Sequence, residues 1–489
     1  MERKNLTFGS IEELQEPLIV KEKDLEPIDT SSKSCSIDMV PQFIRASTPK
    51  DMEMENNNLI TFASIKERKE LILDIEEFLE PQAECCIYRV PKGLRKVNEE
   101  AYTPQVISIG PLHHGKAELS DMEKQKIRYV REFSKRITEK TWQEFINFIE
   151  ENEQRIRNCY AEMPKFEKME LITMILYDAV FIIEYFLRGR NHTGFKSDFL
   201  LNNRRVRGSI RRDLQLLENQ LPYFVLKGLY KLAFDSRPNQ KGNPSLFSLS
   251  CGFFYDSMFN GLMPKEVEVI EHFTDLRRYV ITKTHRYHAI AKAPKLRGAK
   301  KDIHCVVKLH ESGVIFRHFK DAECLIDIRF KKPKLPQIIL ASSELQIPRI
   351  GIYDGTECLI RNVMALEQCH YPQETVMCNY ISLMDRLIDT EGDVNLLVEA
   401  GIISNGVGDT AKIAKMFNQL CQHISYSSAS CYYDIFMNLQ AHYNDPWNHA
   451  KATLKRVYFT NLWTGTGTIA AVVLLVLTLI QTICSIRSV

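Results

Sequence analysis

Residues Ile469–Ile486, IAAVVLLVLTLIQTICSI, form an almost wholly apolar run near the C-terminus. No charged residue occurs between Arg456 and Arg487. With the preceding Gly465–Thr468, the run provides about 22 residues, and a helix of that length spans roughly 33 Å, the thickness of the hydrocarbon core of a bilayer. A buried helix of a soluble protein would show a polar face over this length, and this run shows none. The sequence therefore predicts one transmembrane helix at residues 465–486.

The residues beside this run predict its orientation. Upstream stand aromatic residues suited to a membrane interface and a basic cluster, namely Tyr458, Phe459, Trp463, Lys451, Lys455 and Arg456. Downstream, only Arg487 is basic. Basic flanks stay on the cytoplasmic side, and Met1–Ser10 lacks the apolar segment of a secretory signal. We therefore expect a tail-anchored, single-pass protein of the plasma membrane or an endomembrane, with its body in the cytoplasm.

The composition is that of a globular chain with almost no net charge. Hydrophobic residues make up 44% of the 489 residues and charged residues 26%, with Lys+Arg 64 against Asp+Glu 62. Most of the chain can bury a core, and no overall charge attracts nucleic acid, so no nucleic-acid partner is expected. The 13 cysteines are scattered and include no C-x-x-C pair, which favours reduced thiols in a cytosolic body.

Three domains are predicted along the chain. Residues 1–80 are an acidic extension with few aromatic residues, so little apolar surface is available to order it beyond a charged helix at Ser64–Glu80. Residues 81–460 are a helical body with a small β part near 305–350. The transmembrane helix follows.

Apolar residues at helical spacing define the helices expected in the body, at Asp121–Glu151, Leu171–Leu187, Ser209–Tyr230 and Val376–Leu387. Pro222 is expected to kink or split the third of these helices. A short strand is predicted at Val106–Ile109, and a basic linker at 281–302 precedes the β part, whose strands include Leu325–Phe330. The fold class is thus mainly α with a small β region (α+β), plus the membrane helix.

The segment Gly110–Ala117, GPLHHGKA, resembles a phosphate-binding loop, G-x-x-x-x-G-K-[ST], in which Lys116 would be the phosphate-binding lysine. Two residues depart from that pattern. Ala117 lacks the hydroxyl that would hold Mg²⁺, and Pro111 lacks a backbone N–H. Nucleotide hydrolysis is therefore not expected.

Two groups of residues resemble metal ligands only loosely. His113 and His114 are adjacent, so their side chains diverge and at most one would face a site. Cys421, His423 and Cys431 lack a fourth ligand at the usual spacing. No metal and no other cofactor is expected.

Four carboxylates lie within apolar stretches: Asp178, Glu184, Asp213 and Glu218. If their helices pack together, a hydrolase with paired carboxylates is conceivable. Buried pairing with Arg211, Arg212 or a helix N-terminus is the favoured interpretation. No catalytic residue is therefore assigned.

Two further patterns bear on membrane and compartment. The basic run Arg204–Arg212 is expected to be a solvated helix entry, with contact to anionic lipid as the alternative. Asn5 and Asn191 stand in glycosylation sequons, which matter only if the body lies outside the cytosol.

Several motifs in order resemble the plant "domain of unknown function 247" family. They include Ile87–Pro91 (IYRVP), Ile109–Gly115 (IGPLHHG), Met122–Lys126 (MEKQK), Asp213–Leu226 (DLQLLENQLPYFVL) and Leu325–Phe330 (LIDIRF). The resemblance covers about residues 86–485. Leu112 stands where an aromatic residue is common in the family, and Tyr223 where Phe is common.

The resemblance implies a plant protein that is associated with a membrane and has no assigned enzyme activity. Some grass members are linked to self-incompatibility, which implies recognition or signalling. We therefore expect a non-catalytic, membrane-anchored protein that binds membrane lipid through its C-terminal helix and an unknown protein partner through its body. An undiscovered enzyme and an extracellular self-recognition protein are the alternatives, and self-association is left open.

Overall fold

The computed structural model describes residues 81–190, 198–234, 244–254, 266–267, 269–282, 303–333, 342–425, 430–458 and 462–487. They belong to the second of two units, Met1–Glu76 and Glu77–Val489, into which the chain divides. The predicted extension at 1–80, most of the linker at 281–302 and the sequons at Asn5 and Asn191 lie outside the described residues.

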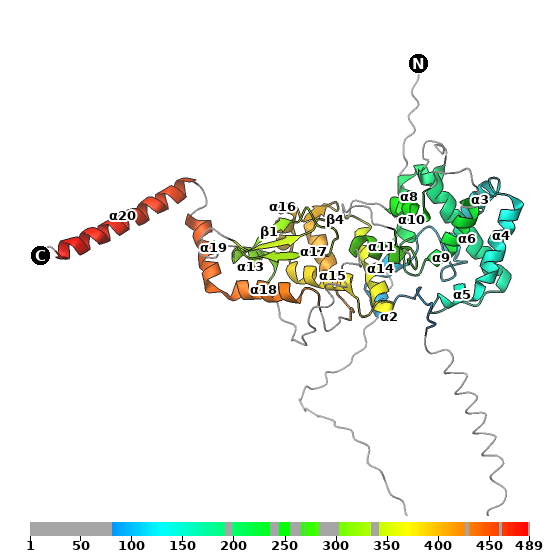
Figure 1. The fold of residues 1–489 in the computed structure, drawn as a ribbon, viewed down its shortest axis with the longest axis horizontal. Coiled ribbons are helices and arrows are strands. Elements are labelled where there is room, and N and C mark those ends of the chain that lie inside the picture. Colours follow the sequence, from blue (N-terminus) through cyan, green and yellow to red (C-terminus); the bar gives the residue numbers. More distant parts are fainter. Residues whose placement is uncertain are drawn as a thin grey trace, which may run out of the picture. The chain divides into compact units, whose positions relative to one another are not determined.

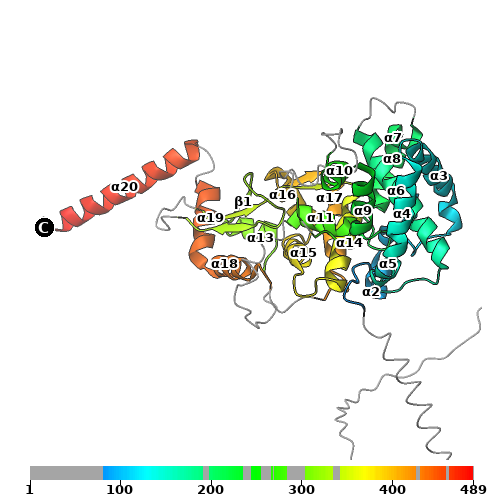
Figure 2. The ribbon, with the colours of Figure 1, turned by 45° about the vertical axis from the view of Figure 1, so that its right-hand side comes forward.

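The first part of the body is a group of helices around one central helix. They are α2 (Lys92–Val97), α3 (Ser120–Ser134), α4 (Glu139–Glu151), α5 (Glu153–Asn158), α6 (Lys168–Arg190), α7 (Phe199–Asn202), α8 (Arg204–Asp213), α9 (Tyr223–Phe234), α10 (Leu246–Phe254) and α11 (Phe273–Thr282). Helices α3, α4, α9 and α10 all pack against α6 (Figures 1 and 2). Because α6 carries apolar residues on all sides, its neighbours bury most of it.

The predicted helices of this part are confirmed with one correction. The helix predicted at Leu171–Leu187 lies within α6, and the one predicted at Ser209–Tyr230 is split before Pro222 into α8 and α9. The single helix predicted at Asp121–Glu151 is wrong, because the chain forms α3 and α4 instead. Thr138 accepts a hydrogen bond from the N–H of Thr141 and so starts a new helix.

The second part combines helices with two small sheets. Its elements are α13 (Val306–Glu311), β1 (Ile315–His318), β2 (Arg329–Lys331), β3 (Glu344–Ile347), β4 (Ile350–Ile352), α14 (Thr356–Cys369), α15 (Val376–Leu387), α16 (Glu391–Glu399), β5 (Ile403–Asn405) and α17 (Thr410–Leu420). In one sheet β3 pairs with β1 in parallel and with β2 antiparallel, and in the other β4 pairs with β5 in parallel. The mainly α fold with a small β region is thus confirmed.

The strand prediction was right in place but not in length. Of Leu325–Phe330, only the end joins β2. The N–H of Leu325 donates instead to the carbonyl of Ile281 in α11, 3.1 Å away, so this end of the segment joins a helix rather than a sheet.

Three helices complete the chain: α18 (Tyr433–Asn444), α19 (Pro446–Tyr458) and α20 (Leu462–Arg487). Figure 1 draws α20 in red as one continuous helix. Its segment Thr466–Arg487 has a mean hydropathy of 2.6 over its most apolar window, and none of that window is buried. The helix predicted at 465–486 is therefore present, and it is long and apolar enough to cross a membrane.

Candidate functional site

Residues 213–222, here called the connecting segment, run from the last residue of α8 to the start of α9, and 214–222 form no helix. Asp213, the first of them, is fully buried. Its carboxylate accepts hydrogen bonds from the backbone N–H groups of Gln105, Val106 and Ile107, at 2.7 to 3.1 Å. This carboxylate therefore holds a distant stretch of chain in place.

No strand forms at Val106–Ile109, so that prediction is wrong. The N–H groups of Val106, Ile107 and Ile109 donate to side chains of the connecting segment and not to another strand. The N–H of Ile109 donates to Asn219 Oδ1 at 2.7 Å, and Asn219 Nδ2 donates to the carbonyl of Ile107 at 3.0 Å. The amide of Asn219 thus replaces a neighbouring strand.

Gly110 lies where the backbone of the connecting segment comes closest. Its φ is +71°, and a Cβ at this position would overlap the carbonyl oxygen of Gln220. That carbonyl also accepts a hydrogen bond from Tyr160 Oη at 2.9 Å, while Gln220 Oε1 accepts one from the N–H of Phe273 at 2.9 Å. Only glycine fits this position.

Glu218 is the acidic centre of the connecting segment. It forms an ion pair with Arg95, accepts the N–H of Val90 at 2.6 Å, and lies 3.3 Å from His113 Nε2. Burial alone would raise the pKa of Glu218, but the His113 imidazole, the Val90 N–H and Arg95 together lower it to about 2. Burial also lowers the pKa of His113, so the imidazole is neutral beside a carboxylate anion.

Asp178 on α6 is bound from two sides. Lys126 Nζ lies 2.6 Å from one of its oxygens, and the N–H of Gly110 donates to the other at 2.8 Å. Lys126 also pairs with Glu123 at 2.6 Å. Burial lowers the pKa of Lys126, but the two carboxylates outweigh it and raise that pKa above its ordinary value. Lys126 is therefore a buried ammonium that ties α3 to α6.

Glu184, six residues further along α6, has partners of its own. It forms ion pairs with Arg136 and, at 2.6 Å, with Arg188. Arg188 extends the network to Asp198 at 3.0 Å, and Asp198 accepts a hydrogen bond from Tyr129 Oη at 2.9 Å. These groups join α3, α6 and the start of α7.

The four carboxylates therefore do not form a shared site. Each is held by a different cation or set of backbone N–H groups, and buried polar pairing is confirmed. Of the arginines proposed as partners, only Arg212 pairs with one of them, at 3.4 Å from Asp213. Neither the cavity described below nor a second cavity of 340 Å³ beside α6 and α10 includes any of the four.

The two histidines of the loop point apart, as expected. His113 faces Glu218, whereas the His114 ring lies 5.9 Å from that of Phe166. Among the residues that the structure describes, no group of three His, Cys, Asp or Glu side chains could hold a metal ion, at Cys421 or elsewhere. No disulfide joins the described cysteines.

The basic run Arg204–Arg212 opens α8, with Asn203 as its cap. Its first residues are exposed, which agrees with a solvated helix entry. The later ones are structural: Arg211 lies over the Phe253 ring at 5.6 Å, and Arg212 donates to the carbonyl of Glu100.

Other buried polar residues join the two parts of the body, and these were not singled out from the sequence as site residues. Asn362 on α14 accepts the N–H of Leu217 at 2.9 Å and donates to the carbonyl of Ala101 at 2.8 Å. Glu367 pairs with Arg278 on α11 at 3.1 Å. The available signal is a polar residue within an apolar helix, the same signal that marked Asp178.

His272, just before α11, binds the backbone through both ring nitrogens. Nε2 lies 3.0 Å from the carbonyl oxygen of Cys86, and Nδ1 accepts the N–H of Asp275 at 3.4 Å. A ring that accepts a hydrogen bond must be neutral, and burial lowers the pKa of His272 to about 4.

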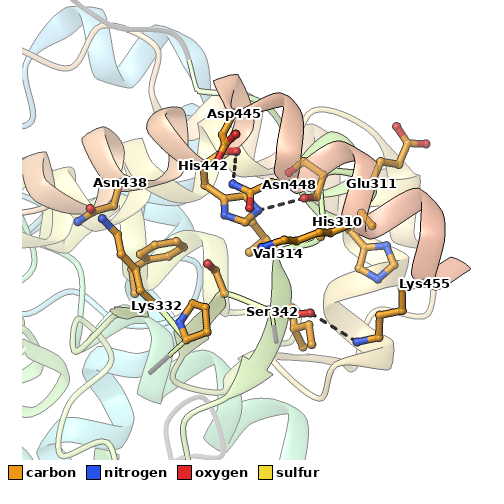
Figure 3. Close-up of a pocket in the computed structure, with 18 of the residues that line it drawn as sticks. His310, Glu311, Val314, Lys332, Ser342, Asn438, His442, Asp445, Asn448 and Lys455 are labelled. Atoms are coloured by element: carbon orange, nitrogen blue, oxygen red, sulfur yellow. Dashed lines mark hydrogen bonds between the residues drawn. The ribbon is translucent and has the colours of Figure 1, made fainter. Parts of the chain in front are cut away.

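A cavity of 710 Å³ lies between α18, α19 and the end of α13 with the adjoining strands, and is here called the neck cavity. Figure 3 shows Lys332 and Lys455 entering it from opposite sides. Lys455 Nζ lies 3.4 Å from Ser342 Oγ. On α18, His442 Nε2 lies 3.0 Å from the carbonyl oxygen of Ser312, so this contact joins α18 to the end of α13 along one wall of the cavity (Figure 3).

The neck cavity is lined by more basic than acidic side chains. The basic ones are Lys332, Lys451, Lys455 and Arg456, and the acidic ones are Glu311 and Asp445. With neutral histidines, four positive and two negative charges leave an excess of +2, as large as the net charge of the whole chain. Asp445 Oδ1 accepts the N–H of Trp447 at 3.0 Å, so this carboxylate also caps α19.

Two threonines of helix α20 bond to the helix's own backbone. The hydroxyls of Thr478 and Thr482 each donate to the carbonyl four residues earlier, at 2.8 Å. Its leucines are well exposed, for example Leu475 at 65%. A helix whose Thr478 and Thr482 hydroxyls bond to its own backbone, with apolar side chains on every side, is suited to lipid.

Comparison with known proteins gives a family but no function. The model of a family described as "Plant protein of unknown function", DUF247, matches residues 87–477. The chain is similar to the UPF0481 protein At3g47200 of Arabidopsis thaliana, at 26% identity over 83% of this chain and 87% of that protein. It is also similar to the Putative UPF0481 protein At3g02645 of the same plant, at 23% identity over 85% and 93% of the two chains. No solved structure matches it.

Proposed function

This chain belongs to DUF247, a family of plant proteins of unknown function, and we propose that it is a tail-anchored membrane protein whose helical body binds a protein partner on the cytosolic side. The proposed role is recognition or signalling without catalysis. The plasma membrane and the endomembranes are the proposed locations.

The observation that carries this proposal is α20. Its apolar segment Thr466–Arg487 is 22 residues long and has no part of its most apolar window buried in the body. Leaving that much apolar surface in water is unfavourable by about 25 cal/mol for each Å², so a lipid environment is the one that stabilises it.

The charges beside α20 support the cytosolic orientation. Lys451, Lys455 and Arg456 lie before the apolar segment, and Arg487 alone follows it. Because the side with more Lys and Arg stays in the cytoplasm, the body is proposed to lie there. Reduced cysteines agree with that compartment, since no disulfide joins those that the structure describes.

The buried polar groups support a binding role over a catalytic one. Asp178, Glu184, Asp213 and Glu218 are each committed to holding helices and loops together. A catalytic carboxylate needs access to a substrate, and each of these side chains is almost fully buried. Their chemistry stabilises a defined body that can be recognised by a partner.

The proposal is tested by exchanging the anchor in plant cells. A variant without residues 462–489 is compared with one in which they are replaced by an unrelated apolar helix of equal length. We expect the truncated chain to be soluble and to lose its partners in proximity labelling, whereas the exchanged chain stays in the alkaline-resistant membrane fraction and keeps them. A truncated chain that stays in the membrane fraction would show that α20 is not the anchor. A truncated chain that is soluble but keeps the same partners would show that partner binding does not require membrane anchoring.

A further inference from the structure

The neck cavity has the chemistry of an anion site. Its four basic side chains come from two separate stretches, the residue after β2 and α19, and they line one volume. Lys332 and Lys455 face it from opposite sides (Figure 3). Hydroxyl and amide donors accompany them, among them Ser342 and Asn448. Ammonium groups combined with neutral donors are what a phosphate group requires.

The size of the cavity indicates more than a bare phosphate. At 710 Å³ it lies within the range of pockets that hold small organic ligands, about 300 to 1,000 Å³. A phosphate attached to a sugar-sized group fits such a volume. Phe330 and Val314 add apolar surface against which the carbon skeleton of such a group can pack.

The position of the cavity in the chain favours a ligand presented by a membrane. Leu462, the start of α20, follows Lys455 by seven positions. Even a fully extended chain of that length reaches only about 25 Å. If α20 spans the membrane, the cavity is thereby kept within reach of the lipid headgroups on the side of the body.

A second face of α19 also favours a membrane ligand. Trp447 and Tyr458 are separated by three helical turns and lie on one side, where they are 72% and 49% exposed, and Val457 beside them is 54% exposed. By helical spacing, Lys451 and Lys455 of the cavity lie next to this side of α19, whereas Arg456 lies on the opposite side. An exposed aromatic side next to a basic side is typical of a helix that lies in a membrane interface.

We propose that the neck cavity binds the phosphorylated headgroup of an anionic membrane lipid, with Lys332 and Lys455 as its main ionic contacts. This inference rests on the proposed function, because it takes the membrane to be that of α20. The shared chemistry is a phosphate on a small polyol, which a soluble sugar phosphate would also supply.

The test uses the full-length chain purified in detergent and titrated calorimetrically with short-chain phosphatidylinositol 4-phosphate. The double variant Lys332→Gln/Lys455→Gln is compared with a control, Lys124→Gln/Lys140→Gln, which removes the same charge from exposed positions on α3 and α4. Each lysine near an anionic headgroup contributes about fivefold in affinity, so we expect the cavity variant to bind about 25-fold more weakly and the control to bind like wild type.

Two outcomes would overturn the inference. Equal loss of affinity in the cavity and control variants would mean that only general charge attracts the lipid. Equal affinity for inositol 1,4-bisphosphate and for the lipid would identify a soluble phosphate as the ligand. The same samples are also reconstituted into phosphatidylcholine nanodiscs, which tests the membrane anchor separately. Failure of the chain to enter the discs would refute the proposed function. Headgroup binding is measured in detergent and does not depend on that result.

Discussion

Gly110→Ala and Gly115→Ala form a matched pair that isolates the role of the connecting segment. Both glycines have a left-handed backbone, with φ of +71° and +76°. A Cβ at position 115 would meet nothing within 4 Å, whereas one at position 110 would overlap the carbonyl of Gln220 and lie 3.0 Å from Tyr160 Oη. The two substitutions therefore share the backbone strain and differ in the close contact.

The magnitudes follow from these two effects. The left-handed conformation costs an alanine about 1 to 2 kcal/mol at either position. At position 110, the connecting segment must also move, which disturbs the hydrogen bond from Tyr160 to Gln220 and adds about 1 to 3 kcal/mol. We expect Gly115→Ala to lower the free energy of unfolding by about 1 kcal/mol and Gly110→Ala by about 3 kcal/mol.

The assay is urea unfolding of the full-length chain in detergent, followed by both circular dichroism and tryptophan fluorescence. Coincident transitions by the two probes justify a free-energy comparison. Equal losses in the two variants would refute the reasoning, since they would show that the approach of Gln220 to Gly110 is not restrictive.

Three further substitutions test other parts of the account. Asp213→Ala leaves three backbone N–H groups, one of them buried, without their acceptor. It should cost about 3 kcal/mol and speed hydrogen exchange at those amides, whereas Asp121→Ala at an exposed site should change neither. The pKa of His272 is about 4 in the folded protein against an ordinary 6.5, so its contribution to stability is full above pH 6.5 and is lost as the pH falls toward 4. Wild type should lose roughly 3 kcal/mol more than His272→Gln over that range in urea titrations at each pH, and parallel pH curves would contradict this. In α20, Leu475→Arg/Leu479→Arg should move the protein from the membrane to the soluble fraction, because each charge at the centre of a span costs about 2.5 to 3.5 kcal/mol, while the same two leucines changed to Phe should leave it membrane-bound.

The elements that the sequence predicts correctly depend on short-range patterns. The apolar run of α20, the apolar helix α6 and the break before Pro222 are each visible within a window of about 20 residues. The break inside Asp121–Glu151 was missed, although Thr138 is a residue type that commonly caps a helix.

The failures arise where the partner lies far away in the chain. Val106–Ile109 has the composition of a strand, but its hydrogen bonds go to Asp213 and Asn219, more than 100 positions later. The sequence marks these polar residues as unusual without indicating what they bind. The neck cavity is harder still, because Lys332 and Lys455 come together only after the sheet and α19 are in place.

Glycosylation mapping in plant cells tests the central claim most directly, because it reports on which side of the membrane each end of α20 lies. A sequon is added after Val489, and its modification is compared with that of Asn191 in the same molecule. The account predicts a glycan on the added sequon and none on Asn191, since the body is in the cytosol and the C-terminus crosses the membrane. A glycan on Asn191 with a bare C-terminal sequon would contradict the account and place the body outside the cytosol.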